Sequence, residues 1–148
     1  LDTKRPATRW TNGFMVSRFR PILLTGFATF DRNMEIEHWL QRFKERWKSH
    51  NVDGVMELFA EGVDYYETPF RKLESRQEIR TEWMQVKQQR NIEIDTDVFA
   101  SQGSKHAVKY ALRYTEDGDR RELRGVYLVT LNEEGECTEI WQYFQEDS

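Results

Sequence analysis

The chain has 148 residues, a length that suits one domain built around a single hydrophobic core. Its formal net charge of −4 argues against a general nucleic-acid-binding protein, which needs a basic face. Cys137 is the single cysteine, so no disulfide can form within the chain; this fits a reducing compartment, and we expect a cytoplasmic protein. No stretch approaches the roughly 20 apolar residues of a membrane span, so we expect no membrane partner.

The first 33 residues differ in composition from the rest. They carry six basic residues against two acidic ones, a net charge of +4 that leaves −8 for the remainder. Pro6, Pro21 and Gly26 interrupt any long periodic pattern. We expect residues 1–33 to form an N-terminal, tail-like extension or a translated upstream stretch, with the domain over 34–148. Two alternatives stay open: a targeting peptide, because the segment is rich in Arg and poor in acids, or a helix or strand docked onto the domain.

The domain is predicted to open with an amphipathic helix over 36–49. Ile36, Leu40, Phe43 and Trp47 recur at spacings of four, three and four, and polar residues fill the opposite face. This spacing places the four apolar side chains on one side of a helix, and we expect that side to face the core.

A second, shorter helix is predicted directly afterwards. Asn51 or Asp53 can cap it, because each has a side-chain oxygen that accepts a hydrogen bond from a free backbone N–H group. Leu58 and Phe59 would lie on its apolar side, and Gly62 marks its end.

A short strand and a third helix come next. The strand covers 63–68 and stops at Pro69, which has no N–H for the ladder. Residues 71–74 are predicted to form a turn. Ser75 and Glu78 match a capping box and open the third helix.

The C-terminal half is predicted to form a sheet. Tyr110 and Leu112 alternate with Lys109 and Arg113, which is the period of a strand with one buried face, and Asp117-Gly118 is a strong hairpin signal. Helices segregated to one side of an antiparallel sheet give an α+β architecture. The four predicted strands cover 92–101, 106–115, 121–131 and 136–145.

The order of elements and three local phrases resemble the NTF2-like superfamily, in particular its SnoaL-like members. The phrases lie at 51–60, 63–69 and 140–144, and the resemblance covers 36–145. It implies a cone in which three N-terminal helices pack on a curved, mainly antiparallel sheet, with a cavity at the open end. It also implies a homodimer formed through the sheet, and Val126 and Leu128 make the outer face apolar enough for such a contact.

The steroid isomerases of this superfamily use a carboxylate base and two hydrogen-bond donors. Matching the motifs places the base at Thr68 and the donors at Phe43 and Tyr127. A threonine hydroxyl is far too weak a base, and phenylalanine cannot donate a hydrogen bond. Glu67 could replace the base, but strand alternation places it on the face opposite Thr68.

The epoxide hydrolases of this superfamily use two carboxylates bridged by an arginine. The acid on the final strand falls on Gln142, and the Arg-x-Asp pair falls near 113–115, which lacks the acid. Glutamine can orient a water molecule but cannot take its proton. Neither set of known catalytic residues is therefore expected.

The same motif matches predict a pocket that is apolar with neutral polar tips, the usual lining of a small-molecule site. Its ligand would be a small apolar or aromatic molecule, and no cofactor is expected. Alternatively, these rings simply fill the core. The expected lining residues are Phe43, Phe59, Tyr66, Thr68, Trp83, Tyr110, Leu112, Tyr127, Ile140, Gln142 and Phe144.

Three functions stay open on this reading. The first is ligand binding without catalysis. The second is an isomerase, cyclase or hydrolase with a non-standard acid and base set, in which Tyr127 works with Tyr66 or Glu67. The third is a protein-binding module. We expect no metal site, because His38, His50 and His106 share no ligand spacing, and we expect all three at the surface; Cys137 is expected to be a structural thiol.

Overall fold

The computed structural model describes the backbone of residues 20–148 and the side chains from residue 33 onward. The chain divides into two units between Met34 and Glu35. The described part of the first unit belongs to helix α2, Arg20–Lys48, whose remainder lies in the second unit. The tail expected over 1–33 therefore falls in large part on residues 1–19, which lie outside the described residues.

Helix α2 begins at Arg20, so the predicted start at Ile36 is wrong. Pro21 is the second residue of the helix, where its missing N–H costs no hydrogen bond and its fixed φ suits the first turn. Gly26 lies inside the helix and weakens it by about 1 kcal/mol relative to alanine, which does not end it. The expectation that Pro21 and Gly26 interrupt a periodic element is therefore wrong, since both lie within α2.

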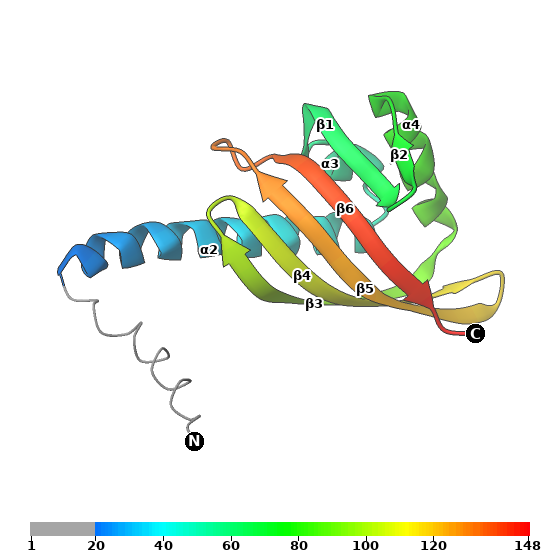
Figure 1. Cartoon of the computed structure of the whole chain (residues 1–148). Coiled ribbons are helices and arrows are strands. Elements are labelled where there is room, and N and C mark those ends of the chain that lie inside the picture. The colour runs from blue at the N-terminus through cyan, green and yellow to red at the C-terminus, as the bar shows by residue number, and fades with distance from the viewer. Residues whose placement is uncertain (1–19) are drawn as a thin grey trace, which may run out of the picture. The chain divides into compact units, whose positions relative to one another are not determined.

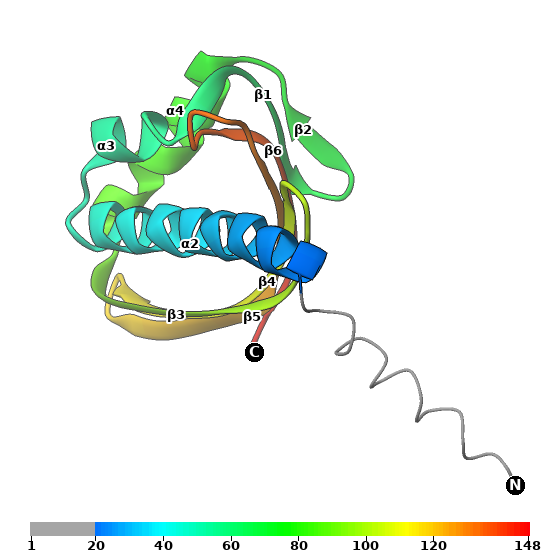
Figure 2. The ribbon, with the colours of Figure 1, turned by 90° about the vertical axis from the view of Figure 1, so that its left-hand side faces the viewer.

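The second unit is built around the C-terminal part of α2. Figure 2 shows the curved sheet wrapped around this helix. The predicted apolar side is confirmed, and Trp39 belongs to it as well. The buried residues of the helix are Ile36, Trp39, Leu40, Phe43 and Trp47.

Six strands form one sheet in the order β2-β1-β6-β5-β4-β3 (Figure 1). The pairing of β1 with β6 is parallel, and every other neighbouring pair is antiparallel. The predicted α+β class and the last four predicted strands are confirmed. The strands are β1 (Phe59–Thr68), β2 (Arg71–Leu73), β3 (Arg90–Gln102), β4 (Lys105–Glu116), β5 (Asp119–Leu131) and β6 (Cys137–Glu146).

The second helix, α3, is shorter than predicted and covers Val52–Met56. Asn51 is its cap, since its side-chain oxygen accepts from the N–H of Gly54 at 2.9 Å. The prediction that Phe59 lies on this helix is wrong, because Phe59 opens β1 and pairs with Cys137 of β6. This segment belongs instead to the parallel ladder between β1 and β6, a long-range pairing that local sequence does not reveal.

The segment after β1 also differs from its prediction. Residues 71–73, expected in a turn, form the short strand β2, in which Leu73 pairs with Tyr65. The predicted cap of the third helix is confirmed, because the hydroxyl of Ser75 accepts from the N–H of Glu78 at 3.0 Å. This helix is α4, Arg76–Trp83, and the 3₁₀ helix η2, Met84–Gln88, continues it.

Aromatic rings fill the core between α2 and the sheet. Phe43 stacks on Trp39 at a centroid distance of 4.9 Å and meets Trp83 edge-on at 5.5 Å. The indole N–H of Trp39 donates to the carbonyl of Leu58 at 3.1 Å, so its polar atom is satisfied inside the core. Phe43 and Phe59 are at most 2% exposed and act as packing residues.

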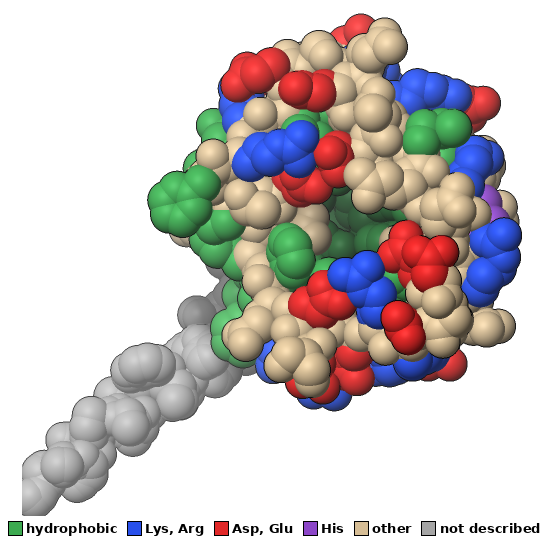
Figure 3. Space-filling view, turned by 90° about the vertical axis from the view of Figure 1, so that its right-hand side faces the viewer, with side chains coloured by type: hydrophobic (Ala, Val, Ile, Leu, Met, Phe, Trp, Pro, Cys, Tyr) green, Lys and Arg blue, Asp and Glu red, His purple; other side chains and the backbone are tan. Residues whose placement is uncertain are grey.

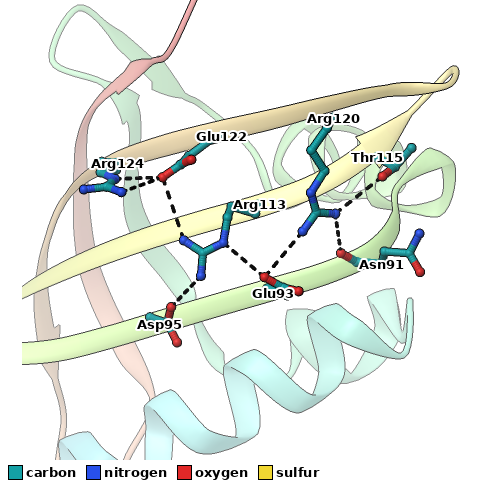
Figure 4. A network of polar contacts seen from close by, with 8 residues as sticks. All are labelled: Asn91, Glu93, Asp95, Arg113, Thr115, Arg120, Glu122 and Arg124. Carbon is teal, nitrogen blue, oxygen red and sulfur yellow. Dashed lines mark hydrogen bonds and ion pairs between the residues drawn. The ribbon is translucent and has the colours of Figure 1, made fainter.

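The outer face of the sheet carries charge at one end and rings at the other. Figure 4 shows Arg113 of β4 between Glu93 and Asp95 of β3 and Glu122 of β5, at distances of 2.7 to 3.8 Å. These groups are partly exposed, and exposed pairs of this kind contribute about 0–1 kcal/mol each. Arg113 therefore faces away from the core, as its predicted alternation with the buried Leu112 requires.

One of the three histidines is buried. His106 is 4% exposed, and its Nδ1 lies 2.7 Å from the hydroxyl of Ser101, so the expectation of a surface histidine is wrong there. It shares the inward face of β4 with Val108 because its position continues the alternation of that strand. His50 lies at the end of α2, where its Nε2 donates to the carbonyl of Gln89.

Two further observations concern the described residues. Cys137 is buried, and this burial raises the pKa of its thiol to about 12, which suits a structural role. No helix among the residues that the structure describes is long and apolar enough to cross a membrane.

Candidate functional site

A hollow of about 320 Å³ opens on the concave side of the sheet. Figure 3 shows apolar side chains inside it and acidic and basic side chains around its mouth. Every layer of the domain contributes to its wall. The lining residues are Trp47, Tyr65, Glu67, Glu82, Trp83, Gln85, Val86, Gln89, Leu112, Tyr114, Glu116, Arg121, Leu123, Gln142, Phe144 and Glu146.

The hollow brings together some of the residues expected to line it and leaves others elsewhere. Trp83, Leu112, Gln142 and Phe144 line it. Five others do not line it and are buried in the core: Phe43, Phe59, Tyr110, Tyr127 and Ile140. Tyr66 and Thr68 lie elsewhere on β1.

The predicted facing of β1 is wrong. Tyr65 and Glu67 face the hollow, whereas Tyr66 stacks on Trp141 of β6 at a centroid distance of 3.6 Å. Long-range pairing sets this facing, since Tyr65 pairs with the buried Ile140 of β6. The ladder between β1 and β6 has a register shift between Phe59 and Asp64, so alternation counted along the sequence does not predict it. Thr68 instead accepts a hydrogen bond from the N–H of Phe70 in the hairpin turn.

Tyr65 and Trp83 join β1 to α4 on the wall of the hollow. The indole N–H of Trp83 donates to the hydroxyl oxygen of Tyr65 at 3.1 Å. Tyr65 is 7% exposed, and burial raises the pKa of its hydroxyl far above the ordinary value, so it stays protonated. Among the described residues, its own proton has no hydrogen-bond acceptor, which leaves a buried donor directed by a second hydrogen bond.

A second buried polar group, the hydroxyl of Tyr110, contacts Gln142. The side-chain amide of Gln142 donates to this hydroxyl at 3.1 Å, and the ring of Tyr110 stacks on that of Tyr127 at 4.1 Å. Burial raises the pKa of Tyr110 to about 12 and that of Tyr127 well above its ordinary value. Both are therefore neutral hydrogen-bonding groups near neutral pH and cannot serve as bases.

Two carboxyl groups from different elements meet at the rim. One guanidinium nitrogen of Arg71 in β2 contacts Glu67 of β1 and lies 3.1 Å from the carboxylate of Glu82 in α4. Burial, followed by hydrogen bonding to and repulsion by Glu82, raises the pKa of Glu67 against the opposing effect of Arg71. Glu67 can therefore exchange a proton closer to neutral pH than an ordinary glutamic acid.

A second ion cluster lies on the sheet side of the rim. Arg121 of β5 donates two hydrogen bonds to Glu146 of β6, at 2.6 and 2.7 Å, and one to Glu116 of β4, at 2.9 Å. Its guanidinium lies 5.7 Å from the ring centroid of Tyr114. Hydrogen bonding from Arg121 lowers the pKa of Glu146. This two-pronged geometry fixes the cation between the two acids.

The predicted uncharged lining is thus wrong at the rim. Glu82 falls three residues after the buried Ile79 of α4, so helical spacing could have shown that it faces the interior. Glu116, Arg121 and Glu146 lie at strand ends, where no local pattern marks a meeting point. Among the described residues, no group of three or more His, Cys, Asp or Glu side chains could hold a metal ion.

Solved structures share this fold at low sequence identity. SalBIII, an epoxide hydrolase/cyclase-like enzyme with a role in pyran ring formation in the polyether salinomycin, is 19% identical, with a TM-score of 0.65 over 79% of this chain and 92% of that one. RV0760c from Mycobacterium tuberculosis, in complex with estradiol-17β-hemisuccinate, is 16% identical, with a TM-score of 0.63 over 75% of this chain and 98% of that one. The Δ5-3-ketosteroid isomerase from Mycobacterium sp. is 14% identical, with a TM-score of 0.63 over 76% and 98%.

Comparison at the sequence level identifies the family. A search of curated proteins finds no match. The family model described as the SnoaL-like domain matches residues 40–140, which is more than half of the chain. With its curved, unclosed sheet and the three α-helices of its described residues, the chain belongs to the SnoaL-like family of NTF2-like proteins.

Proposed function

We propose that the chain binds a small molecule with an apolar, ring-containing body in the concave hollow. The observation that carries this proposal is the buried hydroxyl of Tyr65, which lines a hollow of about 320 Å³ and has a proton without an acceptor among the described residues. A buried unmade hydrogen bond costs about 1–3 kcal/mol, and an oxygen atom of a ligand would recover that energy. The volume and the mixture of rings with a few polar groups are typical of small-molecule sites.

The solved relatives support this proposal through what their descriptions state of them. One was solved with a steroid derivative, one is a steroid isomerase and one is an enzyme of ring formation. All three handle molecules with rings. Because their identities are below 20%, they guide the choice of probes and do not define the ligand.

Calorimetric titration with two neutral probes, estradiol and 2-naphthol, tests the binding proposal. Leu112→Trp should abolish binding because the added ring fills the hollow. Phe99→Trp is the control, since Phe99 is 70% exposed and does not line the hollow. If Leu112→Trp binds either probe as tightly as wild type does, the proposal is wrong.

We also propose that two copies associate through the outer face of the sheet. Leu128, Tyr143 and Trp141 lie on this face, and the first two are about 40% exposed. Leu128 and Trp141 line a groove of about 430 Å³ there, and an exposed apolar patch of this kind is typical of an interface. Light scattering should show a dimer that Leu128→Lys converts to a monomer. A monomeric wild-type protein at 100 μM contradicts this.

A second candidate function is acid–base catalysis by Glu67. The specific observation in its favour is the raised pKa of this carboxyl group on the wall of a ring-lined hollow. A carboxylate with such a pKa can take a proton from a bound molecule and return it. Tyr66, the other candidate acid–base residue, lies against Trp141 and not against the hollow.

The ring opening of 5-nitrobenzisoxazole is a direct assay for a positioned base. The base takes the proton from the ring carbon, the N–O bond breaks, and the nitrile-bearing phenolate that forms is coloured. Wild type should accelerate this reaction, and the rate should rise with pH above the ordinary pKa range of a glutamic acid. Glu67→Gln should lower the rate at least tenfold. Tyr66→Phe should match wild type. Equal rates for wild type and Glu67→Gln would exclude Glu67 as the base.

A further inference from the structure

Acidic groups outnumber basic ones on the wall of the hollow. Four of the lining residues are glutamates and one is an arginine. Figure 3 shows acidic and basic side chains around the mouth of the hollow. Arg121 is fully engaged, since it pairs with Glu146 through two nitrogens and with Glu116 through the third. The remaining two acids, Glu67 and Glu82, therefore have no cation within the wall itself.

The partner of Glu67 and Glu82 approaches from outside. Arg71 contacts both carboxyl groups through one nitrogen, its side chain is about half exposed, and it is not a lining residue. Each carboxylate can accept about four hydrogen bonds. Glu82 also accepts from the side-chain amide of Gln85 at 3.2 Å, and lone pairs still remain on both acids, which line the hollow. The raised pKa of Glu67 has the same origin, because burial and the neighbouring acid both disfavour its negative charge.

Ring faces continue the wall below these acids. Trp47, Trp83 and Tyr114 line the hollow. The guanidinium of Arg121 over the ring of Tyr114 shows that this wall already holds one cation against an aromatic face. Such contacts contribute about 0.5–1 kcal/mol when exposed and more when desolvated.

Tyr65, a buried residue on the same wall, prefers a hydrogen-bond acceptor instead of a cation. The hydroxyl of Tyr65 accepts from Trp83 and has its own proton left to donate. An N–H that donates to the hydroxyl oxygen polarises the O–H bond and strengthens the donor. The hollow therefore favours a ligand with a hydrogen-bond acceptor at the Tyr65 end and a cation at the end of Glu67 and Glu82.

We propose that the hollow selects an organic cation: a ring-sized apolar body with an acceptor oxygen at its deep end, on Tyr65, and a protonated amine at the rim, beside Glu67 and Glu82. This inference rests on the proposed binding function of the same hollow and adds the charge of the ligand to it. A cation at this place relieves the repulsion between the two acids and completes their hydrogen bonding.

Three probes that differ in charge test the inference. They are 4-methoxyphenethylamine, 2-(4-methoxyphenyl)ethanol and 3-(4-methoxyphenyl)propionate, which share a methoxy oxygen for Tyr65. In calorimetric titrations at pH 7 and low salt, the amine should bind at least tenfold more tightly than the alcohol, and the acid should bind most weakly. Raising the salt concentration should weaken binding of the amine and leave binding of the alcohol unchanged.

Variants then locate the preference. The double variant Glu67→Gln/Glu82→Gln should reduce the advantage of the amine over the alcohol to about threefold or less while still binding the alcohol. The matched control is Glu93→Gln/Glu122→Gln, because both of these acids lie in the outer-face network and are partly exposed. Arg71→Gln should strengthen binding of the amine, since it removes the competing cation. Circular dichroism checks that each variant is folded.

The outcomes separate the two proposals. If the alcohol binds as tightly as the amine, or if the double variant keeps the advantage of the amine, the inference about charge is overturned while ligand binding stands. If the amine, the alcohol, estradiol and 2-naphthol all fail to bind wild type, the binding proposal falls and the charge inference falls with it.

Discussion

The indole nitrogen of Trp83 donates to the hydroxyl of Tyr65 at 3.1 Å and so connects α4 to β1 on the wall of the concave hollow. Both residues are less than 10% exposed, which means that each depends on the other for its polar atom. The two lie 18 positions apart in the chain, and they come together because β1 and α4 are packed on the same core. This one contact links the stability of the domain to the shape of its candidate site.

Tyr65→Phe should lower the free energy of unfolding by about 1–3 kcal/mol, because it leaves the buried N–H of Trp83 without an acceptor. It should also weaken binding of 2-(4-methoxyphenyl)ethanol, which loses its donor. Urea denaturation and calorimetry measure the two effects. Tyr143→Phe is the control, since its side chain is 41% exposed, and it should change neither quantity. Equal losses in the two variants would contradict the assigned role of Tyr65.

Arg76 is expected to stabilise the junction between α3 and β1. Its guanidinium donates to the carbonyl of Met56 at 2.6 Å and to those of Phe59 and Ala60 at 3.2 Å. Arg76→Ala leaves these carbonyls without a charged donor and should cost about 2 kcal/mol of unfolding free energy. Arg80→Ala, which removes only an ion pair with the exposed Asp53, should cost less than about 1 kcal/mol. Thermal and urea unfolding compare the two; a larger loss for Arg80→Ala would be contrary evidence.

Gly125 lies where two strands approach closely. A Cβ added there would clash with the carbonyl oxygen of Tyr143 and lie 2.8 Å from the backbone of Phe144. Because backbone atoms of β6 cannot move aside, Gly125→Ala should destabilise the domain by about 1–3 kcal/mol. Gly62→Ala is the matched control, since nothing lies within 4 Å of its added Cβ. Denaturant midpoints report the difference, and equal midpoints would show that β5 and β6 can separate at this point.

The pH dependence of stability should depend on Glu67. Its pKa in the folded state lies above the unfolded value, so the folded state holds more protons between the two pKa values and stability falls as pH rises through this window. The charged groups facing it are Glu82 from α4 and Arg71 from β2, with Tyr65 two residues earlier in β1.

Glu67→Gln cannot lose a proton, so it should gain stability relative to wild type as pH is raised from about 4 to about 7. The lowered pKa of Glu146 acts equally in both proteins and cancels in this difference. Urea unfolding at several pH values measures the trend, with Glu133→Gln in the exposed turn before β6 as control. A constant difference across this range would show that the pKa of Glu67 is not shifted in the folded protein.

Local patterns predicted the elements that depend on neighbours in the chain. The helical spacing of Leu40 and Phe43, the cap at Ser75 and the alternation of β4 are all present in the structure. The errors lie where distant contacts decide. Phe59 has a helical neighbourhood in sequence, yet a parallel ladder with Cys137 makes it the first residue of a strand.

The register of β1 against β6 decides the lining of the candidate site. Tyr65 pairs with the buried Ile140, after a register shift between Phe59 and Asp64, so Tyr65 and Glu67 line the hollow and Tyr66 lies against Trp141. The pocket that was predicted to be uncharged therefore has an acid, Glu67, on its wall. Glu82 of α4 lies beside it, and Arg71, in a strand that local sequence does not predict, binds both carboxyl groups.

By itself, the sequence determined the α+β class, the last four strands and an aromatic interior, because periodicity and composition express which side chains leave water. Its local motifs carried the resemblance to the family. The tertiary structure alone decided which face of β1 lines the hollow, which rings remain core and which charges meet at the rim. Those features depend on strand register and on contacts between residues far apart in the chain, and no local pattern of side chains encodes either.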